Sequence, residues 1–229
     1  MKISIHQPDY IPYLGYFYKI HLSDKFVYLD DVQYSNDNLH DRNKIKTANG
    51  DLVLKIPVEH KFGDNLNIVK TRDNLGWKQK HLKTILMNYK KAPFFDEIYP
   101  KFEELLLKDY PSLSELNIAI NDFFVKGFDL KVETSRSSEL ALGSARDEKV
   151  IDICTALGGD EYISGHGASV YQVPEHFEEK GLKLTYTDYK PIEYPQLWKG
   201  FSPNMSVIDY VFNCGFDWDR VVSLVNEQN

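Results

Sequence analysis

The sequence has few cysteines and no cysteine pair of the kind that binds zinc. Cys154 and Cys214 are the only two in 229 residues, and both lie in apolar, helix-like segments. The sequence has no C-x-x-C and no clustered cysteines and histidines, which argues against a structural zinc site. Two buried, reduced thiols are typical of a cytosolic protein.

Long hydrophobic runs and an excess of positive charge are missing as well. No apolar run approaches the ~18–20 residues needed to span a bilayer, and the N-terminus lacks the pattern of a secretory signal. We therefore expect a cytoplasmic protein without membrane insertion. The net charge of −7 gives the whole chain no electrostatic footprint for nucleic acid.

Several catalytic motifs are also absent. The sequence contains no G-x-G-x-x-G, no G-x-S-x-G and no H-E-x-x-H, and no G-K-S/T follows its G-H-G. Cys154 would lie on the apolar face of a helix, which makes it a poor nucleophile. We predict no metal site.

Aromatic residues, in contrast, are abundant, with 15 Tyr and 13 Phe. Core packing and amphipathic surface positions account for most of them. Many rings nevertheless lie beside polar residues, as in the run of residues 9–19. Rings with a polar tip suit pocket walls that hold sugars, bases or planar groups.

Short apolar runs alternate with helix-period segments along the chain, which favours an α/β fold. We expect a mostly parallel Rossmann-like sheet flanked by helices, with a small β-hairpin insertion and a helical C-terminal part. The hairpin is predicted because residues 44–47 and 52–58 flank Asn49-Gly50. The predicted strands cover residues 2–6, 25–30, 67–71, 131–135, 161–163 and 182–186. The predicted helices cover residues 12–21, 76–89, 94–107, 113–126, 145–157, 206–214 and 218–226.

No linker, repeat or low-complexity segment divides the chain. We therefore expect a single domain over residues 1–229. Within it, residues 94–130 form a helical insertion and residues 200–229 a helical C-terminal segment.

Two predicted strands end in polar side chains. The first ends in His6-Gln7, and the second runs into Asp30 and Asp31, with Gln33 shortly after. In open parallel sheets, ligands bind beyond the carboxyl ends of the strands. We therefore predict one pocket lined by His6, Gln7 and one of the two aspartates. One aspartate is expected because adjacent strand residues point in opposite directions.

Each of these side chains has a functional and a structural interpretation. His6 is a candidate general base or phosphate ligand, or a hydrogen-bonded residue that fixes the loop before Pro8. Asp30 and Asp31 are candidates to bind a metal, orient an amine or act as a base. At least one of them is expected to cap the next loop.

Two further clusters are candidate binding sites. Arg42-Asn43-Lys44 suits a diphosphate, with arginine as a fork and lysine as a point charge, or else is a solvated basic patch. Trp77, Lys80 and His81 share a helix face at three-to-four spacing. The structural alternative there is a core tryptophan with an exposed lysine and histidine.

Ser164-Gly165-His166-Gly167 follows a predicted strand. Small residues at such a position expose backbone N–H groups that can hold an anion. The motif is weak by itself and gives no reaction class.

Several stretches, taken in order, resemble the WbqC-like family. They cover nearly the whole chain: HQPDYIPYLGYFYKI, SDKFVYLDDVQY, RNKIKTANGDLVLKIPV, WKQKHLKTILMNYKKAPFF, YISGHGASVYQ and SPNMSVIDYVFNCG. One departure is Asp41, where the family more often shows a residue such as Asn. The positions that carry the resemblance are His6, Gln7, Tyr10, Asp30, Asp31, Gln33, Arg42, Asn43, Lys44, Lys80, His81, Ser164, Gly165 and Tyr171.

The resemblance implies a role in bacterial O-antigen or other surface-polysaccharide biosynthesis. It further implies a transferase that places a glycyl, other aminoacyl or acyl group on the amine of a nucleotide-linked amino sugar. His6 or Asp31 would take the amine proton, Arg42 and Lys44 would hold the diphosphate, and Tyr10 would pack on base or sugar. The N–H groups at Ser164-Gly165 would hold an anion or the oxyanion.

The activated donor is left open between an aminoacyl-tRNA, an acyl carrier and an acyl adenylate, and no other cofactor is predicted. Two alternatives to the transferase also remain. One is a nucleotidyltransferase or ATP-dependent ligase of the same pathway, although the two-histidine signature of adenylate-forming folds is missing. The other is a non-catalytic protein that binds a nucleotide sugar.

Overall fold

A computed structural model describes residues 1–36, 38–170 and 172–228, and the chain forms two compact units. Unit 1 consists of Met1–Gln7, Tyr16–Val32 and Leu130–Tyr189. Unit 2 consists of Pro8–Gly15, Gln33–Asp129 and Lys190–Asn229. Each unit therefore draws on three separate stretches of sequence.

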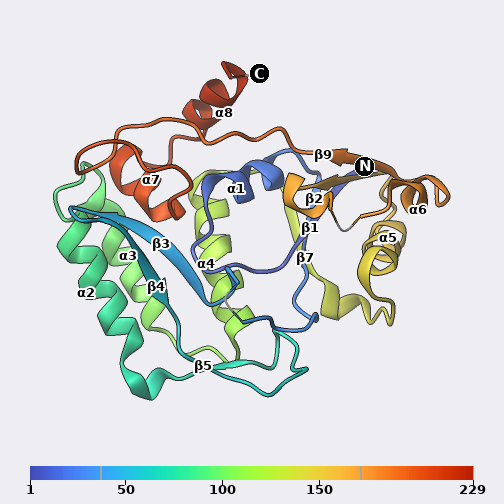
Figure 1. Cartoon of the computed structure of the whole chain (residues 1–229), viewed down its shortest axis with the longest axis horizontal. Helices are drawn as coiled ribbons and strands as arrows, with labels where there is room; N and C mark the ends of the chain where they lie inside the picture. The colour runs from blue at the N-terminus through green and yellow to red at the C-terminus, as the bar shows by residue number, and fades with distance from the viewer. Residues whose placement is uncertain (37, 171, 229) are drawn as a thin grey trace. The chain divides into compact units, whose positions relative to one another are not determined.

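Unit 1 is built on a five-stranded parallel sheet, which can be followed in Figure 1. Its strands are β1 (Lys2–His6), β2 (Lys25–Tyr28), β7 (Glu133–Arg136), β8 (Glu161–Ser164) and β9 (Lys183–Tyr186). Their spatial order is β7-β2-β1-β8-β9, so the strands met first along the chain lie at the centre. This is the 3-2-1-4-5 order of Rossmann-like folds and confirms the predicted α/β class.

The core of unit 1 packs strand residues against two helices, α5 (Arg146–Ala156) and α6 (Pro174–Glu178). Ile3 and Ile5 of β1 are buried beside Ile153 and Cys154 of α5. The turn after α5 passes very close to β1: a Cβ on Gly159 would lie 2.6 Å from the Ile3 side chain. A larger residue at this position would force the Ile3 side chain to move, and glycine avoids this contact.

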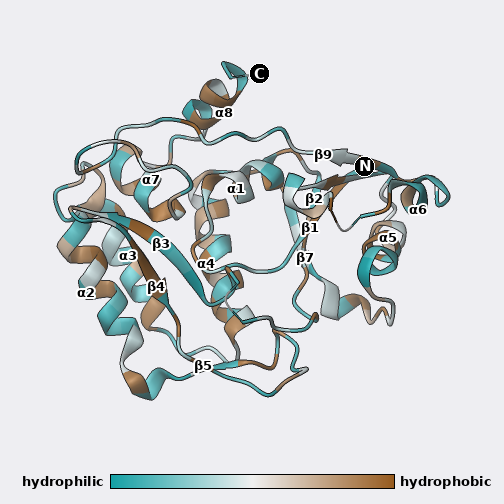
Figure 2. Cartoon of the chain, in the orientation of Figure 1, coloured by the Kyte–Doolittle hydropathy of each residue, from teal (hydrophilic) through white to brown (hydrophobic). Residues whose placement is uncertain are grey.

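Unit 2 is mainly helical. Its helices are α2 (Trp77–Tyr89), α3 (Phe95–Leu107), α4 (Leu113–Gly127), α7 (Val207–Cys214) and α8 (Trp218–Asn226). The predicted Asn49-Gly50 turn joins β3 (Arg42–Thr47) and β4 (Gly50–Lys55) as an antiparallel hairpin. Figure 2 shows the alternation of hydrophilic and hydrophobic residues along α8. Its buried residues Trp218, Val221 and Val225 recur at three-to-four spacing.

Several element boundaries differ from the sequence prediction, and one helix was not predicted; β2, for example, ends at Tyr28 and not at residue 30. The strand expected at 52–58 ends at Lys55, because Pro57 has no N–H to donate to a hydrogen bond between strands. Residues Val58–Glu59 form a separate strand, β5, which pairs with Lys70–Thr71 (β6). Helix α6 was not expected, although Pro174 at its first position is a standard start signal. The short helix before β2, α1 (Leu14–His21), begins two residues after Pro12. Within the described ranges, no helix combines the length and apolarity that a membrane crossing needs.

Candidate functional site

The sheet of unit 1 has one point where its order reverses, between β1 and β8. From β1 the chain proceeds to β2 and β7 on one side, and β8 and β9 lie on the other. Ligands of open α/β sheets bind in the crevice outside the carboxyl ends of the strands at such a switch point. His6 ends β1 and Ser164 ends β8, so both flank this position.

The geometry around His6 fixes the ring. Its Nδ1 lies 2.9 Å from the backbone oxygen of Gln7, and the ring of Tyr16 packs edge-on at 4.9 Å between centroids. Because a carbonyl oxygen only accepts, Nδ1 carries the proton in this contact. The lone pair of the neutral imidazole is then on Nε2, which is the form a general base needs.

Asp30 has a structural role at the end of β7. Its carboxylate accepts from the Ser137 hydroxyl at 3.2 Å and from the Ser138 N–H at 3.0 Å, and the Ser138 hydroxyl adds a third bond at 2.8 Å. The side chain is buried, and it accepts hydrogen bonds from the first two residues of the short 3-10 turn Ser137–Leu140. The expectation was that an aspartate caps the next loop; Asp30 instead bonds to this turn, which lies more than 100 residues further along the chain.

Asp31 faces a buried lysine. Its Oδ2 lies 2.7 Å from Nζ of Lys149, and its Oδ1 accepts from the Ser137 hydroxyl at 2.5 Å. The Asp31 side chain is 17% exposed, against 9% for that of Lys149. We expected only one of the two aspartates to face a pocket, because adjacent residues of a strand point in opposite directions. That reason does not apply to Asp30 and Asp31, because β2 already ends at Tyr28. Both aspartates share Ser137 as a donor.

Sequence reasoning missed Ser137, Ser138 and Lys149. The two serines follow a strand end in the same way as Asp30 and Asp31 do. Lys149 lies four residues before Ile153 and so shares the inward face of α5. Both signals are present in the sequence, but their link to Asp30 and Asp31 spans more than 100 residues.

The loop after β8 has open space around its glycines. The Ser164 hydroxyl is buried and donates to Oε1 of Gln172 at 3.0 Å. Gly165 has φ −80°, and a Cβ at Gly165 or Gly167 would meet no atom within 4 Å. Glycine is thus not needed there for the fold, and the backbone at Gly165 and Gly167 is open to approach. Tyr171 lies outside the described residues.

In unit 2, Tyr10 and His81 form a buried pair. The Tyr10 hydroxyl lies 2.9 Å from Nδ1 of His81, and Nε2 of His81 lies 3.2 Å from the backbone oxygen of Lys55. Nε2 must donate to that carbonyl, so Nδ1 accepts from Tyr10. Burial lowers the pKa of His81 to about 4 and raises that of Tyr10. The pair is therefore neutral at physiological pH.

This arrangement corrects one structural expectation for α2. His81 is buried rather than exposed, together with Trp77, whereas Lys80 is exposed as expected. The buried lysine of the helix is Lys78, whose Nζ lies 2.7 Å from Asp73. Trp77 and His81 are four residues apart, so they lie on the same buried face of α2. Lys80 lies one position before His81 and is exposed.

The Arg42-Asn43-Lys44 cluster lies on β3, and its side chains have separate partners. Nε of Arg42 lies 2.9 Å from the buried carboxylate of Asp41, and Nζ of Lys44 lies 3.0 Å from Asp51. Asn43 is buried and donates to the backbone oxygens of Tyr10 and Ile11. A diphosphate role for Arg42 and Lys44 stays a prediction, as does a binding role for Gln33, which is exposed and bridges to Asn65.

The two cysteines are free and buried, as the sequence predicts. Burial raises the pKa of the Cys154 thiol to about 12 and that of Cys214 to about 11. Neither is an activated nucleophile. Over the described ranges, no three histidine, cysteine or acidic side chains gather as a metal site would require.

The fold and the strand-end residues define an α/β protein with a Rossmann-like sheet whose switch point carries histidine, serine and glycine. The chain belongs to the WbqC-like protein family, whose model matches residues 7–220. It is also 31% identical over 217 residues to Rv1507c of Mycobacterium tuberculosis (strain ATCC 25618 / H37Rv), an uncharacterized protein. That match covers 93% of this chain and 94% of Rv1507c. The search of solved structures found no match.

Proposed function

We propose that the protein is an enzyme that binds a nucleotide-linked amino sugar at the switch point of unit 1 and forms an amide on the sugar amine. The observation that carries this proposal is the sheet order β7-β2-β1-β8-β9 with His6 and Ser164-Gly165 at its reversal. That position is where nucleotides bind in doubly wound α/β sheets. The pathway we propose is bacterial surface-polysaccharide biosynthesis, including O-antigen, and the enzyme would act in the cytoplasm.

The proposed reaction needs a base, an acyl donor and a group that stabilises the oxyanion. The sugar amine attacks the carbonyl carbon of an activated acyl or aminoacyl donor, a C–N bond forms, and the bond from that carbon to the leaving group breaks. Nε2 of His6 takes the amine proton and returns it to the leaving group. Backbone N–H groups after Ser164 are suited to the oxyanion, because the backbone is approachable beside Gly165.

We assign Asp31 a structural role in the site and not the role of the general base. Both of its oxygens already have donors, Ser137 and Lys149. A substrate amine would have to displace one of these donors before it could reach the carboxylate.

The test is turnover of nucleotide-linked amino sugars by the purified protein, followed by intact mass of the product. Each sugar is offered with an aminoacyl-tRNA, an acyl carrier thioester, or an acid together with ATP. A mass gain on the sugar equal to one acyl or aminoacyl group supports the transferase. Conversion of ATP to AMP with the free acid identifies the ligase alternative. Saturable binding of the sugar without turnover of any donor contradicts the enzyme and favours a binding protein.

A further inference from the structure

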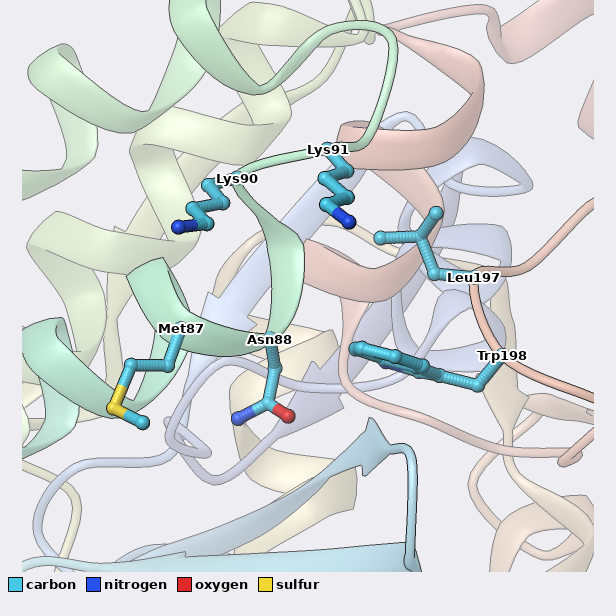
Figure 3. A pocket seen from close by; sticks show the side chains of 6 residues that line it. All are labelled: Met87, Asn88, Lys90, Lys91, Leu197 and Trp198. Carbon is cyan, nitrogen blue, oxygen red and sulfur yellow. The ribbon is translucent and has the colours of Figure 1, made fainter.

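Unit 2 contains a small apolar pocket that the proposed reaction does not use (Figure 3). It encloses about 80 Å³ between the end of α2 and the segment around Trp198. Figure 3 shows Trp198 and Leu197 on one side, facing Asn88 and Lys91 on the other. The lining residues are Met87, Asn88, Lys90, Lys91, Leu197 and Trp198.

Trp198 is held in an unfavourable backbone conformation at this pocket. Its φ is +68°, which is a rare outlier for a bulky side chain, and 41% of its surface is exposed. Such a conformation costs on the order of 1–3 kcal/mol and persists only where the surroundings impose it. The strain at Trp198 therefore costs stability, while 41% of the residue stays exposed.

The surroundings that impose this conformation are visible in the hydrogen bonds. The side chain of Gln196 closes the loop: its Oε1 accepts from the N–H of Ser202 and its Nε2 donates to the oxygen of Ser202, both at 2.9 Å. Nε2 also donates to the buried carboxylate of Asp209 at 2.8 Å. Lys46 adds a bond to Oε1 of Gln196 at 3.0 Å and another to the oxygen of Gly200. The loop is therefore fixed from both ends before any ligand arrives.

The pocket lining is basic. Its two lysines, Lys90 and Lys91, are exposed, as are Lys83 one turn before Met87 and Lys199 next to Trp198. Among the described residues, none of these four lysines forms an ion pair with a carboxylate. The whole chain carries a net charge of −7, so this group of unpaired lysines is a local region of positive charge on a chain with an excess of acidic residues. Met87, 65% exposed, lies in the last turn of α2, four residues after Lys83 and three residues before Lys90, which caps the helix.

We propose that this pocket docks an acidic segment of a partner protein, with one large apolar side chain inserted against Trp198. The volume decides the size of the inserted group. Pockets for whole cofactors or sugar nucleotides measure about 300–1,000 Å³. The roughly 80 Å³ found here suits a single side chain. The exposed methionine and tryptophan supply the apolar contact, and the lysines select acidic neighbours.

The probe is a peptide library of the form Asp-Glu-X-Glu-Asp, with X varied over all residues and the peptides labelled for fluorescence anisotropy. We expect peptides with X as Leu, Met, Phe or Trp to bind, those with X as Ser or Gly to bind at least tenfold more weakly, and affinity to fall with salt. A library with no preference at X, or with no binding at all, overturns the proposal.

Two variants locate the binding. Trp198→Ala and the double variant Lys90→Glu/Lys91→Glu are each expected to lose at least tenfold in affinity for the best peptide. The matched control is Lys61→Glu/Lys180→Glu, which makes the same change in charge at exposed positions away from the pocket lining. Thermal melting shows that each variant is folded. Equal affinity in the parent and Trp198→Ala overturns the proposal, as does an equal loss in the control pair.

Discussion

His6 is the residue whose replacement separates chemistry from structure most directly. The ring is held by Gln7 and Tyr16 in the tautomer that a base requires. Asparagine keeps a polar side chain there but cannot take up a proton near neutral pH. We expect His6→Asn to fold and to lose about 10²–10⁴ in turnover, the usual loss when a general base is removed.

The measurement for His6→Asn is turnover together with thermal melting. Asp31→Asn is the companion variant: it removes the ion pair with Lys149 and is expected to lower the melting temperature. If His6→Asn melts normally and turns over within about threefold of the parent, another residue must act as the general base.

Gly165 offers a second test at the scale of one residue. Its φ of −80° suits any amino acid, and a Cβ would meet nothing in the protein. Gly165→Ala should therefore leave the free energy of unfolding within ~0.5 kcal/mol of the parent. If a ligand approaches this backbone closely, the methyl group should weaken nucleotide-sugar binding at least tenfold. Calorimetry measures this.

Gly143→Ala is the matched control for Gly165→Ala. Gly143 lies in the same unit, and a Cβ there would also meet nothing within 4 Å. Its alanine variant should bind as the parent does. Unchanged binding by Gly165→Ala would remove this loop from the site.

At the scale of elements, α2 is joined to the β3–β4 hairpin through a buried histidine. His81 of α2 donates to the last residue of β4, Lys55, and accepts from Tyr10. A charged imidazole cannot accept from the tyrosine, and the site is apolar. Desolvation therefore keeps the ring neutral, and its pKa falls to about 4 from an ordinary 6.5.

This shift predicts acid destabilisation. The unfolded chain protonates His81 below about pH 6.5, while the folded chain does not until about pH 4. The free energy of unfolding should thus be highest above pH 6.5 and fall by roughly 3 kcal/mol from this group as pH drops to 4. Denaturant titrations at several pH values measure the slope.

His81→Gln is the informative variant for this slope. Its amide can donate to Lys55 and accept from Tyr10 without titrating, so the fall between pH 6.5 and 4 should be smaller than in the parent. His176→Gln, on the exposed face of α6, controls for removal of a histidine as such. Identical slopes for the parent and His81→Gln would contradict the assignment.

Local signals predicted the elements well but not their partners. The apolar runs and the Asn49-Gly50 turn placed β1, β8 and the β3–β4 hairpin, because these depend on neighbouring residues. Sheet order depends on pairing across the chain, so the switch point between β1 and β8 was not readable from the sequence. The bond between Asp31 and Lys149 is equally non-local. Burial of His81 depends on Tyr10, 71 residues away.

At the scale of the whole molecule, the path of the chain links the two units. The chain crosses from one unit to the other five times, at 7/8, 15/16, 32/33, 129/130 and 189/190. Between β2 and β7, Gln33–Asp129 contributes to unit 2 before the sheet of unit 1 is complete. The junction at Gly15 and Tyr16 lies inside α1, so this helix would have to break for the units to unfold separately.

We therefore expect the chain to unfold as one cooperative body, as the single-domain prediction requires. The three tryptophans, Trp77, Trp198 and Trp218, all belong to unit 2, whereas Cys154 is fully buried in unit 1. In a Cys214→Ala background, thiol labelling of Cys154 reports unit 1 while tryptophan fluorescence reports unit 2. Both probes should give the same denaturant midpoint, since neither unit can be assembled from one continuous stretch of chain. If Cys154 becomes reactive at a denaturant concentration where the fluorescence is still that of the native protein, unit 1 opens by itself. The protein would then have to be treated as two folding units.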